Sequence, residues 1–289
     1  MKRIALATAT KLPLLNDDDR LLIPALGELG FAAVPAVWDA PAVCWEEFQA
    51  VVVRSCWDYH ERPEEFLAWV TRLEGAGVPL WNPPAVLRWN SHKSYLRDLA
   101  ARGVPIVPTR WLARSRPVDL ATLLRDAGWR DAVVKPAVSA SAAGTWRTST
   151  ETATTDQGRL NELLLAGDVM VQPFVSEVRD AGEWSILFFG ERYSHAVLKR
   201  PAVDDYRVQW EFGGSAVTLA PPPGLVADAT AVMAAVQGQP LYARVDGVER
   251  AGRLVLMELE LIEPHLFLGW DADATRRLAG ALAKCVTRP

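Results

Sequence analysis

The run Ala50-Val51-Val52-Val53 decides the fold class of the first part of the chain. Four apolar residues in a row, three of them β-branched, indicate a strand that is covered on both faces, as strands of parallel sheets are. Apolar runs and helical patterns alternate on both sides of it, at residues 4–9, 21–29, 63–74 and 78–81. This alternation predicts an α/β domain with a parallel sheet over residues 1–90.

From residue 91 onward the pattern changes to strand-rich segments with tight turns between them. Helices are expected at residues 91–102, 156–165 and 272–284. Strands are expected at residues 133–136, 169–172, 184–189, 193–198, 206–211, 242–247 and 253–261. Turn-forming residues separate several of these strands, at Gly190-Glu191, Asp204-Asp205 and Ala251-Gly252. The second part of the chain is therefore expected to be α+β, with a largely antiparallel sheet.

Length, composition and charge exclude several classes of protein. The chain has 289 residues, of which 50% are hydrophobic and 23% charged, so it can bury a large core and is not a disordered protein. A net charge of −4 gives no basic footprint for nucleic acid or anionic lipid, and no run of 18 apolar residues could cross a membrane. Three widely spaced cysteines fit a reducing compartment. We expect a cytoplasmic protein, and exposed edge strands with 12 tryptophans make a homodimer a reasonable expectation.

Two carboxylates on a late strand carry the strongest chemical signal. In Leu256-Met257-Glu258-Leu259-Glu260-Leu261, Glu258 and Glu260 are two residues apart and therefore point to the same face of a strand. Neighbouring carboxylates repel unless a cation lies between them or a proton is shared, and Asp246 on the preceding strand could complete an oxygen site for Mg²⁺. A solvent-facing charged strand explains the pattern equally well. The opposite face is expected to be apolar and buried, and it consists of Met257, Leu259 and Leu261.

Lys135 and the loop that follows it form the second signal. Lys135 lies in the apolar strand Val133-Val134-Lys135-Pro136, just ahead of the small-residue loop Ser139 to Thr145. The N–H and hydroxyl groups of such a loop can bind phosphates. A single lysine in a strand is more often an edge or snorkelling residue, but the adjoining loop makes the two interpretations about equal. The chain contains no Walker A sequence.

A polar and aromatic segment follows the strand at residues 51–53. Ligands of open α/β sheets bind outside the carboxyl ends of the strands, so this segment predicts a pocket for a polar small molecule. Arg54 could bind a carboxylate there. The residues expected to contact the substrate are Arg54, Ser55, Trp57, Asp58 and Tyr59. The alternative is a loop whose aromatic side chains pack at a domain interface.

The histidines and cysteines form no catalytic or metal-binding pattern. The four histidines, which are far apart and lack zinc-ligand spacing, are interpreted as structural: His60, His92, His195 and His265. Cys56 is near His60 in sequence, but nothing marks an acyl-transfer site and buried cysteines are common. No protein nucleophile is therefore expected.

Taken in order, these segments resemble the ATP-grasp family of carboxylate ligases over residues 90–264. Lys93, in Asn90-Ser91-His92-Lys93, matches the first ATP-contacting lysine of the family, Lys135 matches the second, and residues 139–145 match its mobile phosphate-covering loop. Within the family, the sequence is most similar to the branch that contains the D-cycloserine-forming cyclo-ligase. The segments that carry this similarity are residues 53–60, 89–93 and 258–264.

The resemblance implies ATP and Mg²⁺ as cofactors and a division into three parts. Residues 1–90 would be the substrate-side N-terminal domain, residues 91–175 the small ATP-grasp subdomain, and residues 176–289 the C-terminal subdomain with the metal site. The residues that would bind ATP are Lys93, Lys135, Ser139, Ser141, Gly144, Gln172, Pro173, Phe174, Val175, Glu183 and Lys199. Those that would hold one or two metal ions are Asp246, Glu258 and Glu260, the last of which departs from the common Glu-x-Asn pattern of the family.

The reaction that the resemblance implies is stepwise. A small amino-acid-like carboxylate takes the γ-phosphate of ATP to give an acyl phosphate, and an amine then displaces the phosphate. Arg200 and Lys135 would be catalytic, and Arg200 and Arg207 would add to the substrate contacts. The acid and the amine can belong to two molecules or to one, as a cyclisation requires. Two other classes stay open, namely a small-molecule phosphotransferase on the same nucleotide site and a non-catalytic ATP-binding module.

Overall fold

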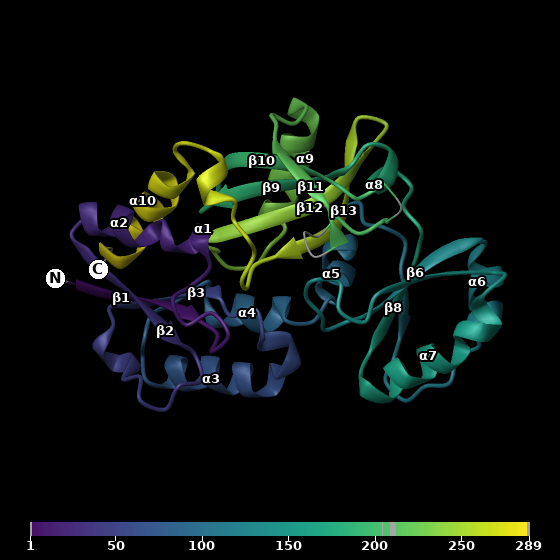
Figure 1. Ribbon diagram of the computed structural model, residues 1–289, viewed down its shortest axis with the longest axis horizontal. Coiled ribbons are helices and arrows are strands. Elements are labelled where there is room, and N and C mark those ends of the chain that lie inside the picture. Colours follow the sequence, from purple (N-terminus) through teal and green to yellow (C-terminus); the bar gives the residue numbers. More distant parts are fainter. Residues whose placement is uncertain (1, 204, 209–211, 288–289) are drawn as a thin grey trace.

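The computed structural model describes residues 2–203, 205–208 and 212–287, and its described strands form three sheets (Figure 1). One sheet is parallel and belongs to the N-terminal part of the chain. The other two are antiparallel and follow it in sequence. The predicted fold class, a parallel α/β part followed by a largely antiparallel α+β part, is therefore confirmed.

The N-terminal sheet has the order β2-β1-β3-β4, and all of its strands are parallel. These strands are β1 (Lys2–Thr8), β2 (Phe31–Val37), β3 (Ala50–Ser55) and β4 (Leu80–Trp81). Successive residues of β3 enter different cores. Val52 packs with helices α2 (Leu22–Glu28) and α10 (Ala274–Thr287), whereas Val51 and Val53 pack with α3 (Pro63–Gly75). Both faces of this strand are thus covered, which explains its continuous apolar run.

The five-stranded sheet has the order β11-β10-β9-β12-β13. Its strands are β9 (Glu183–Phe189), β10 (Arg192–Arg200), β11 (Ser215–Thr218), β12 (Tyr242–Arg250) and β13 (Arg253–Glu260). One large core joins this sheet to three helices, namely α4 (Pro84–Asn90), α5 (Tyr95–Ala101) and α9 (Pro223–Ala234). The last helix, α10, packs instead against α2 of the N-terminal part and thereby links the end of the chain to its beginning.

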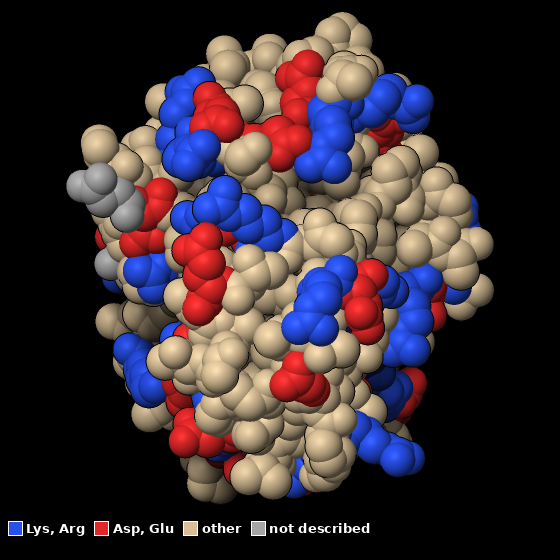
Figure 2. Space-filling model, turned by 90° about the vertical axis from the view of Figure 1, so that its right-hand side faces the viewer, with Lys and Arg blue, Asp and Glu red and all other residues tan. Residues whose placement is uncertain are grey.

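The four-stranded antiparallel sheet, with the order β5-β8-β6-β7, lies at the opposite end of the molecule from the two termini (Figure 1). Its strands are β5 (Arg110–Leu112), β6 (Asp131–Pro136), β7 (Trp146–Ser149) and β8 (Val169–Pro173). Helices α6 (Leu120–Ala127) and α7 (Ala153–Ala166) share a core with this sheet. Figure 2 shows the outer surface at this end, where basic and acidic side chains are interspersed. A short helix, α8 (Glu177–Asp180), follows β8.

Several elements differ from the expectation for local reasons. Strand β2 was not predicted, because Pro35 interrupts its apolar run, and this proline is tolerated since β2 is an edge strand. The helix expected from residue 91 begins only at Tyr95. Of the strand expected at residues 206–211, residues 206–208 are not a strand and the rest lie outside the described residues. Within the described ranges, no helix has the length and apolar character that a membrane span needs.

Candidate functional site

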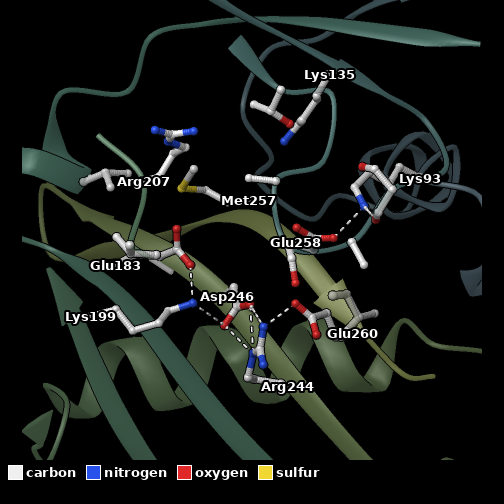
Figure 3. Close-up of a pocket in the computed structure, with 18 of the residues that line it drawn as sticks. Lys93, Lys135, Glu183, Lys199, Arg207, Arg244, Asp246, Met257, Glu258 and Glu260 are labelled. Atoms are coloured by element: carbon white, nitrogen blue, oxygen red, sulfur yellow. Dashed lines mark hydrogen bonds and ion pairs between the residues drawn. The ribbon is translucent and has the colours of Figure 1, made fainter. Parts of the chain in front are cut away.

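A pocket lies between the two antiparallel sheets (Figure 3). The four-stranded sheet contributes Lys135 from β6 and Gln172 from β8. The five-stranded sheet contributes Glu183 from β9, Asp246 from β12 and Glu258 from β13. Side chains of one strand that are two residues apart share a face, so each strand can supply a row of polar groups to the pocket without losing its apolar face to the core.

Most of the residues predicted from the sequence are brought together here. The pocket is lined by the predicted residues Trp57, Tyr59, Lys93, Lys135, Ser139, Ser141, Gln172, Pro173, Phe174, Val175, Glu183, Lys199, Arg207, Asp246, Glu258 and Glu260. The predicted residues that do not line it are Arg54, Ser55, Asp58, Gly144 and Arg200. The segments at residues 57–59 and 258–260 are about 200 positions apart in the chain, and they meet because the N-terminal sheet packs beside the five-stranded one.

The lysines of the pocket differ in their partners. The Lys93 ammonium is 2.7 Å from Glu258 Oε1 and donates to the carbonyl oxygen of Ser139 at 2.7 Å. Lys135 has no hydrogen bond or ion pair with any residue that the structure describes, and it projects from the wall opposite the carboxylates (Figure 3). Burial lowers the pKa of Lys135, although the charge of Glu258 counteracts it. A half-buried cation without a described partner is suited to receive an anionic ligand.

The carboxylates form a network with two further cations. Lys199 Nζ is 2.5 Å from Glu183 Oε1 and 3.5 Å from Asp246 Oδ1. The Arg244 guanidinium is 2.9 Å from Asp246 Oδ2 and also contacts Glu260. Asp246 faces Glu258 across the two strands, and Arg244 faces Glu260, so the register of β12 and β13 builds this arrangement directly.

The environment moves the pKa values of two of these carboxyl groups in opposite directions. For Glu258, burial favours the neutral acid, but the charges of Lys93 and Lys135 outweigh burial and lower the pKa. For Glu260, burial dominates over the charge of Arg244 and raises the pKa to about 7. Titratable groups that are perturbed by burial and by specific charges within a cleft are typical of functional sites.

The three predicted metal ligands face one pocket but are not a preformed metal site. Among the residues that the structure describes, no group of three His, Cys, Asp or Glu side chains is arranged to hold a metal ion. Instead, Lys93 and Arg244 contact the oxygen atoms of Glu258, Asp246 and Glu260. The donors are all carboxylate oxygens, which is the ligand type that Mg²⁺ prefers. The residue types therefore fit the ion, provided that the two cations move away from the carboxylates.

A bulge in β13 corrects one detail of the prediction. Asp246 pairs with Glu258 but the next residue, Gly247, pairs with Leu256, so Met257 is an extra residue in the strand. The bulge turns Met257 into the pocket, whereas the alternation of the sequence predicted it on the buried face. Leu259 remains in the core, as predicted.

Arg54 lies outside the pocket, contrary to the predicted substrate contact. It is fully buried, and its Nε donates to Asp19 Oδ1 at 2.9 Å. A second nitrogen donates to the carbonyl oxygen of Pro264 at 2.6 Å, and the Ser55 hydroxyl donates to Asp19 as well. These groups tie the N-terminal sheet to the segment that follows β13. Asp58 is likewise used internally, because it accepts hydrogen bonds from the Trp38 indole and from Arg62.

Arg200 and Gly144 are also displaced from their predicted positions. Arg200 is exposed at the end of β10 and does not line the pocket. Successive side chains of a strand point to opposite faces, and Lys199 is the one that points into the pocket. Gly144 has a φ of +69°, and a Cβ atom at this position would lie 2.9 Å from Pro136 Cγ. Glycine is therefore required for the path of the loop.

Sequence reasoning did not name as site residues several polar residues that line the pocket, and those with an acidic or basic side chain include Arg244, Glu263 and His265. Arg244 could have been found, because it is two residues before Asp246 and must therefore share its face of β12. Glu263 and His265 follow the end of β13, where no periodic pattern fixes the direction of a side chain. Their positions depend on the contact with the N-terminal part.

Comparisons with known proteins agree with this arrangement. Residues 4–82 match the family described as D-cycloserine synthetase DcsG, N-terminal domain. The chain is 34% identical to the cycloserine biosynthesis protein DcsG of Streptomyces lavendulae over 296 aligned residues, which cover 97% of this chain and 98% of the relative. The crystal structure of D-cycloserine synthetase DcsG superposes with a TM-score of 0.89 at 32% identity, over 99% of this chain and 100% of the other.

More distant solved structures share the fold. The D-alanine–D-alanine ligase from Bacillus anthracis matches with a TM-score of 0.73 at 16% identity, over 99% of this chain and 97% of the other. An ATP-grasp RimK domain protein from Sphaerobacter thermophilus matches with a TM-score of 0.70 at 17% identity, over 99% and 100% of the two chains. At these identities the likeness extends to the chain path of all three sheets.

Proposed function

The chain belongs to the family of the D-cycloserine synthetase DcsG and is an ATP-grasp ligase, and on this premise we propose that it activates a small amino-acid-like carboxylate as an acyl phosphate, which an amine then attacks. The observation that carries the proposal is the meeting of Lys93, Lys135 and Lys199 with the carboxylates of β12 and β13 in one pocket. Cations for the phosphates and carboxylates for a metal ion, gathered in one pocket, are what the transfer of a phosphoryl group requires.

ATP would lie along the length of the pocket. Residues 172–175, at the end of β8, and Met257 offer backbone groups and an apolar surface for the adenine, and Glu183 lies where a ribose hydroxyl could donate to it. Lys93 and Lys135 would then meet the phosphates. The unpaired ammonium of Lys135 supports this direction, because a phosphate oxygen would supply the partner that no described residue provides.

Mg²⁺ would be held by Asp246, Glu258 and Glu260, whose oxygen atoms fit this ion. When bound, it neutralises the charge of the phosphates. Lys93 and Arg244 now pair with these carboxylates, and we propose that they turn toward the phosphates and the acyl group once the carboxylates hold the metal. Arg244 thereby takes the role that the sequence suggested for Arg200, because its guanidinium lies beside Asp246 and Glu260 inside the pocket.

The substrate would occupy the part of the pocket formed by Trp57 and Tyr59. Trp57 and Tyr59 are two of the three predicted substrate residues that line the pocket, and Arg207 is the third. The names of the relatives state cycloserine biosynthesis and D-cycloserine synthesis. We therefore propose that the attacking nitrogen is carried by the side chain of the same amino-acid-like molecule, that it displaces phosphate from the acyl phosphate, and that the product is a ring. The loop at residues 139–145 would cover the phosphates and keep water from the acyl phosphate.

The proposal is tested by an ADP-release screen over amino acids and O-substituted serines, with the products identified by mass. Hydroxylamine is added in parallel, because it converts an acyl phosphate to a hydroxamate and leaves a phosphate ester unchanged. We expect hydroxamate that requires both ATP and Mg²⁺. A stable phosphorylated product without hydroxamate would indicate a phosphotransferase instead, and the absence of any ADP release would favour a binding module.

We also propose a cellular location and an oligomeric state. The use of ATP supports a cytoplasmic location, which fractionation of cells would test. A homodimer would be detected by light scattering during size-exclusion chromatography. The edge strand β11 carries the exposed side chain of Val217 and offers a surface for such pairing.

A further inference from the structure

Glu263 is a buried carboxylate on the pocket wall that has no cation beside it. Its exposed fraction is 8%, and it lines the pocket three residues beyond the end of β13. Glu258 and Glu260 each contact a cation, whereas no described side chain forms an ion pair or a hydrogen bond with the Glu263 carboxylate. Its own backbone N–H is the one hydrogen-bond donor that acts on the carboxylate among the described residues. A buried charge with so little compensation is unfavourable, so its position on the pocket wall indicates a ligand.

The backbone around Glu263 is held from the N-terminal part of the chain. The Trp57 indole nitrogen donates to the carbonyl oxygen of Glu263 at 3.1 Å. Arg54 donates to the carbonyl oxygen of the next residue, Pro264. The carboxylate therefore stands on an anchored segment and needs little rearrangement to bind a ligand, which favours affinity.

The charges of Glu260, Lys93 and Arg244 reach Glu263 without an ion pair, and a histidine and three aromatic rings line the same pocket. Nδ1 of His265 is buried and has no hydrogen-bond partner among the described residues. Trp57, Tyr59 and Phe267 line the same pocket, and the rings of His265 and Phe267 are in edge contact with centroids 4.5 Å apart. A carboxylate among aromatic rings attracts a cation and repels an anion.

The electrostatics of the pocket show that no cation fully compensates Glu263. Burial and, to a smaller extent, the charge of Glu260 raise the pKa of Glu263 to about 8, and the charges of Lys93 and Arg244 counteract them only in part. Burial also raises the pKa of the Tyr59 phenol, with the charge of Glu263 as the next cause. A bound cation would reverse both effects, since an opposite charge close by favours the ionised carboxylate.

We propose that Glu263 binds the ammonium group of the amino-acid-like substrate and so determines the specificity of the enzyme for amino acids over simple carboxylic acids. Met257 belongs to the part of the pocket proposed for the adenine, whereas Glu263 is on the segment that the Trp57 indole holds. The substrate ammonium would lie at this far end, and its carboxylate would point back toward the lysines. The proposal rests on the proposed function, because it concerns the acid that is activated.

The test compares two acids with two variants. The acids are the most active O-substituted serine of the ADP-release screen and the 3-hydroxypropionate with the same O-substituent, which lacks only the amino group. The variant is Glu263→Gln, which keeps the shape and removes the charge. The control is Glu191→Gln, at an exposed glutamate in the turn between β9 and β10. ATP-dependent hydroxamate formation gives kcat/KM for each acid.

We expect the wild-type enzyme and the control variant to prefer the amino acid by at least about 10-fold. Since a hydrogen bond to a charged group contributes a factor of roughly 10 to 100, Glu263→Gln should lower kcat/KM for the amino acid by that factor, chiefly through KM. For the acid without an amino group, Glu263→Gln should have a kcat/KM within about twofold of the wild-type value, because this acid cannot make the interaction.

Two results would overturn the proposal. One is an unchanged preference in Glu263→Gln, and the other is an equal loss for both acids, which would indicate a structural role. If the variant does not fold, as judged by thermal unfolding, the wild-type ratio for the two acids still decides, because a ratio near one excludes an ammonium site. Failure of the wild-type enzyme to form hydroxamate from any acid would instead contradict the proposed function.

Discussion

At the end of β3 the charged side chain of Arg54 turns into the protein, whereas on β12 and β13 the charged side chains turn into the pocket. Arg54 and Asp19 are both at most 1% exposed and are bonded to each other. Glu258 and Lys93 are also bonded, but the carboxylate keeps 32% of its side-chain surface exposed. The first pair fixes how the two sheets meet, and the second remains accessible to a ligand.

The difference follows from the surroundings of each segment. The backbone beyond β3 enters the contact with residues 263–264, so its polar side chains must satisfy carbonyl groups there. Strands β12 and β13 have one face in the core and one face toward an open pocket, so their polar residues accumulate on the open face. A polar run after a parallel strand therefore does not by itself identify the residues that contact a ligand.

The largest expected effect is the loss of activity when a charged residue of the pocket is removed. Lys135→Ala should lower kcat for ATP-dependent hydroxamate formation by about 100- to 1000-fold, the loss typical for one group that stabilises developing charge. Thermal stability should change little, because Lys135 has no described partner to lose. Lys11→Ala, at a surface lysine, is the control. Near-normal ADP production by Lys135→Ala would remove Lys135 from the catalytic machinery.

The buried pair of Arg54 and Asp19 predicts an effect on the stability of the folded protein. Arg54→Met leaves Asp19 buried without its cation, which typically destabilises a protein by about 3–5 kcal/mol. Denaturant unfolding measures this loss, and the double variant Arg54→Met/Asp19→Asn should recover part of it because the uncompensated charge is gone. The KM for the acid should change in the folded fraction only as far as the lost hydrogen bond to the Pro264 carbonyl loosens the segment that carries Glu263. A raised KM with normal stability would restore Arg54 as a substrate residue.

The sequence was sufficient for the fold class and for most of the pocket because both depend on local periodicity. The apolar run at residues 50–53 and the alternation around Glu258 and Glu260 are such patterns. The direction of Arg54 was not predictable, since it depends on its pairing with Asp19 from a distant helix. The bulge at Met257 arises from a change of register between two strands, which has no signature in either strand alone.

The same limit explains why Glu263 was overlooked. It lies outside a regular strand, and only the packing of the N-terminal part against the segment after β13 turns it into the pocket. Arg244 was a different kind of omission, because its two-residue spacing from Asp246 was available in the sequence. What sequence patterns could not supply is therefore mainly the information that resides in contacts between the sheets.

A smaller effect concerns the pH dependence of stability, in which Glu263 should differ from the carboxylates that have ion-pair partners. Its raised folded-state pKa of about 8 means that the folded protein holds a proton which the unfolded chain loses near pH 4.5. Stability associated with Glu263 is therefore complete below about pH 4.5 and is lost as the pH rises toward and through 8. The free energy of unfolding of Glu263→Gln relative to that of wild type should therefore rise between pH 5 and pH 9. The rise should be about 1–3 kcal/mol, after allowance for relaxation.

Unfolding by urea at the two pH values measures this difference. The charges that face the carboxyl group are those of Glu260, Lys93 and Arg244, and all three remain in the variant. A stability difference between variant and wild type that is the same at both pH values would mean that a cation already compensates Glu263. It would thereby weaken the contrast between Glu263 and the paired carboxylates of β13.

The smallest expected effect is at Arg200, where adjacent residues of one strand face opposite ways. Arg200→Ala should leave kcat/KM for hydroxamate formation within about twofold of wild type, as is usual for an exposed residue outside a site. Lys199→Ala is the matched comparison, and it should be strongly impaired because it removes the cation between Glu183 and Asp246. If instead Arg200→Ala were the more damaged of the two, the β10 segment would have to rotate during catalysis, and the division between inward and outward charges would not hold on this strand.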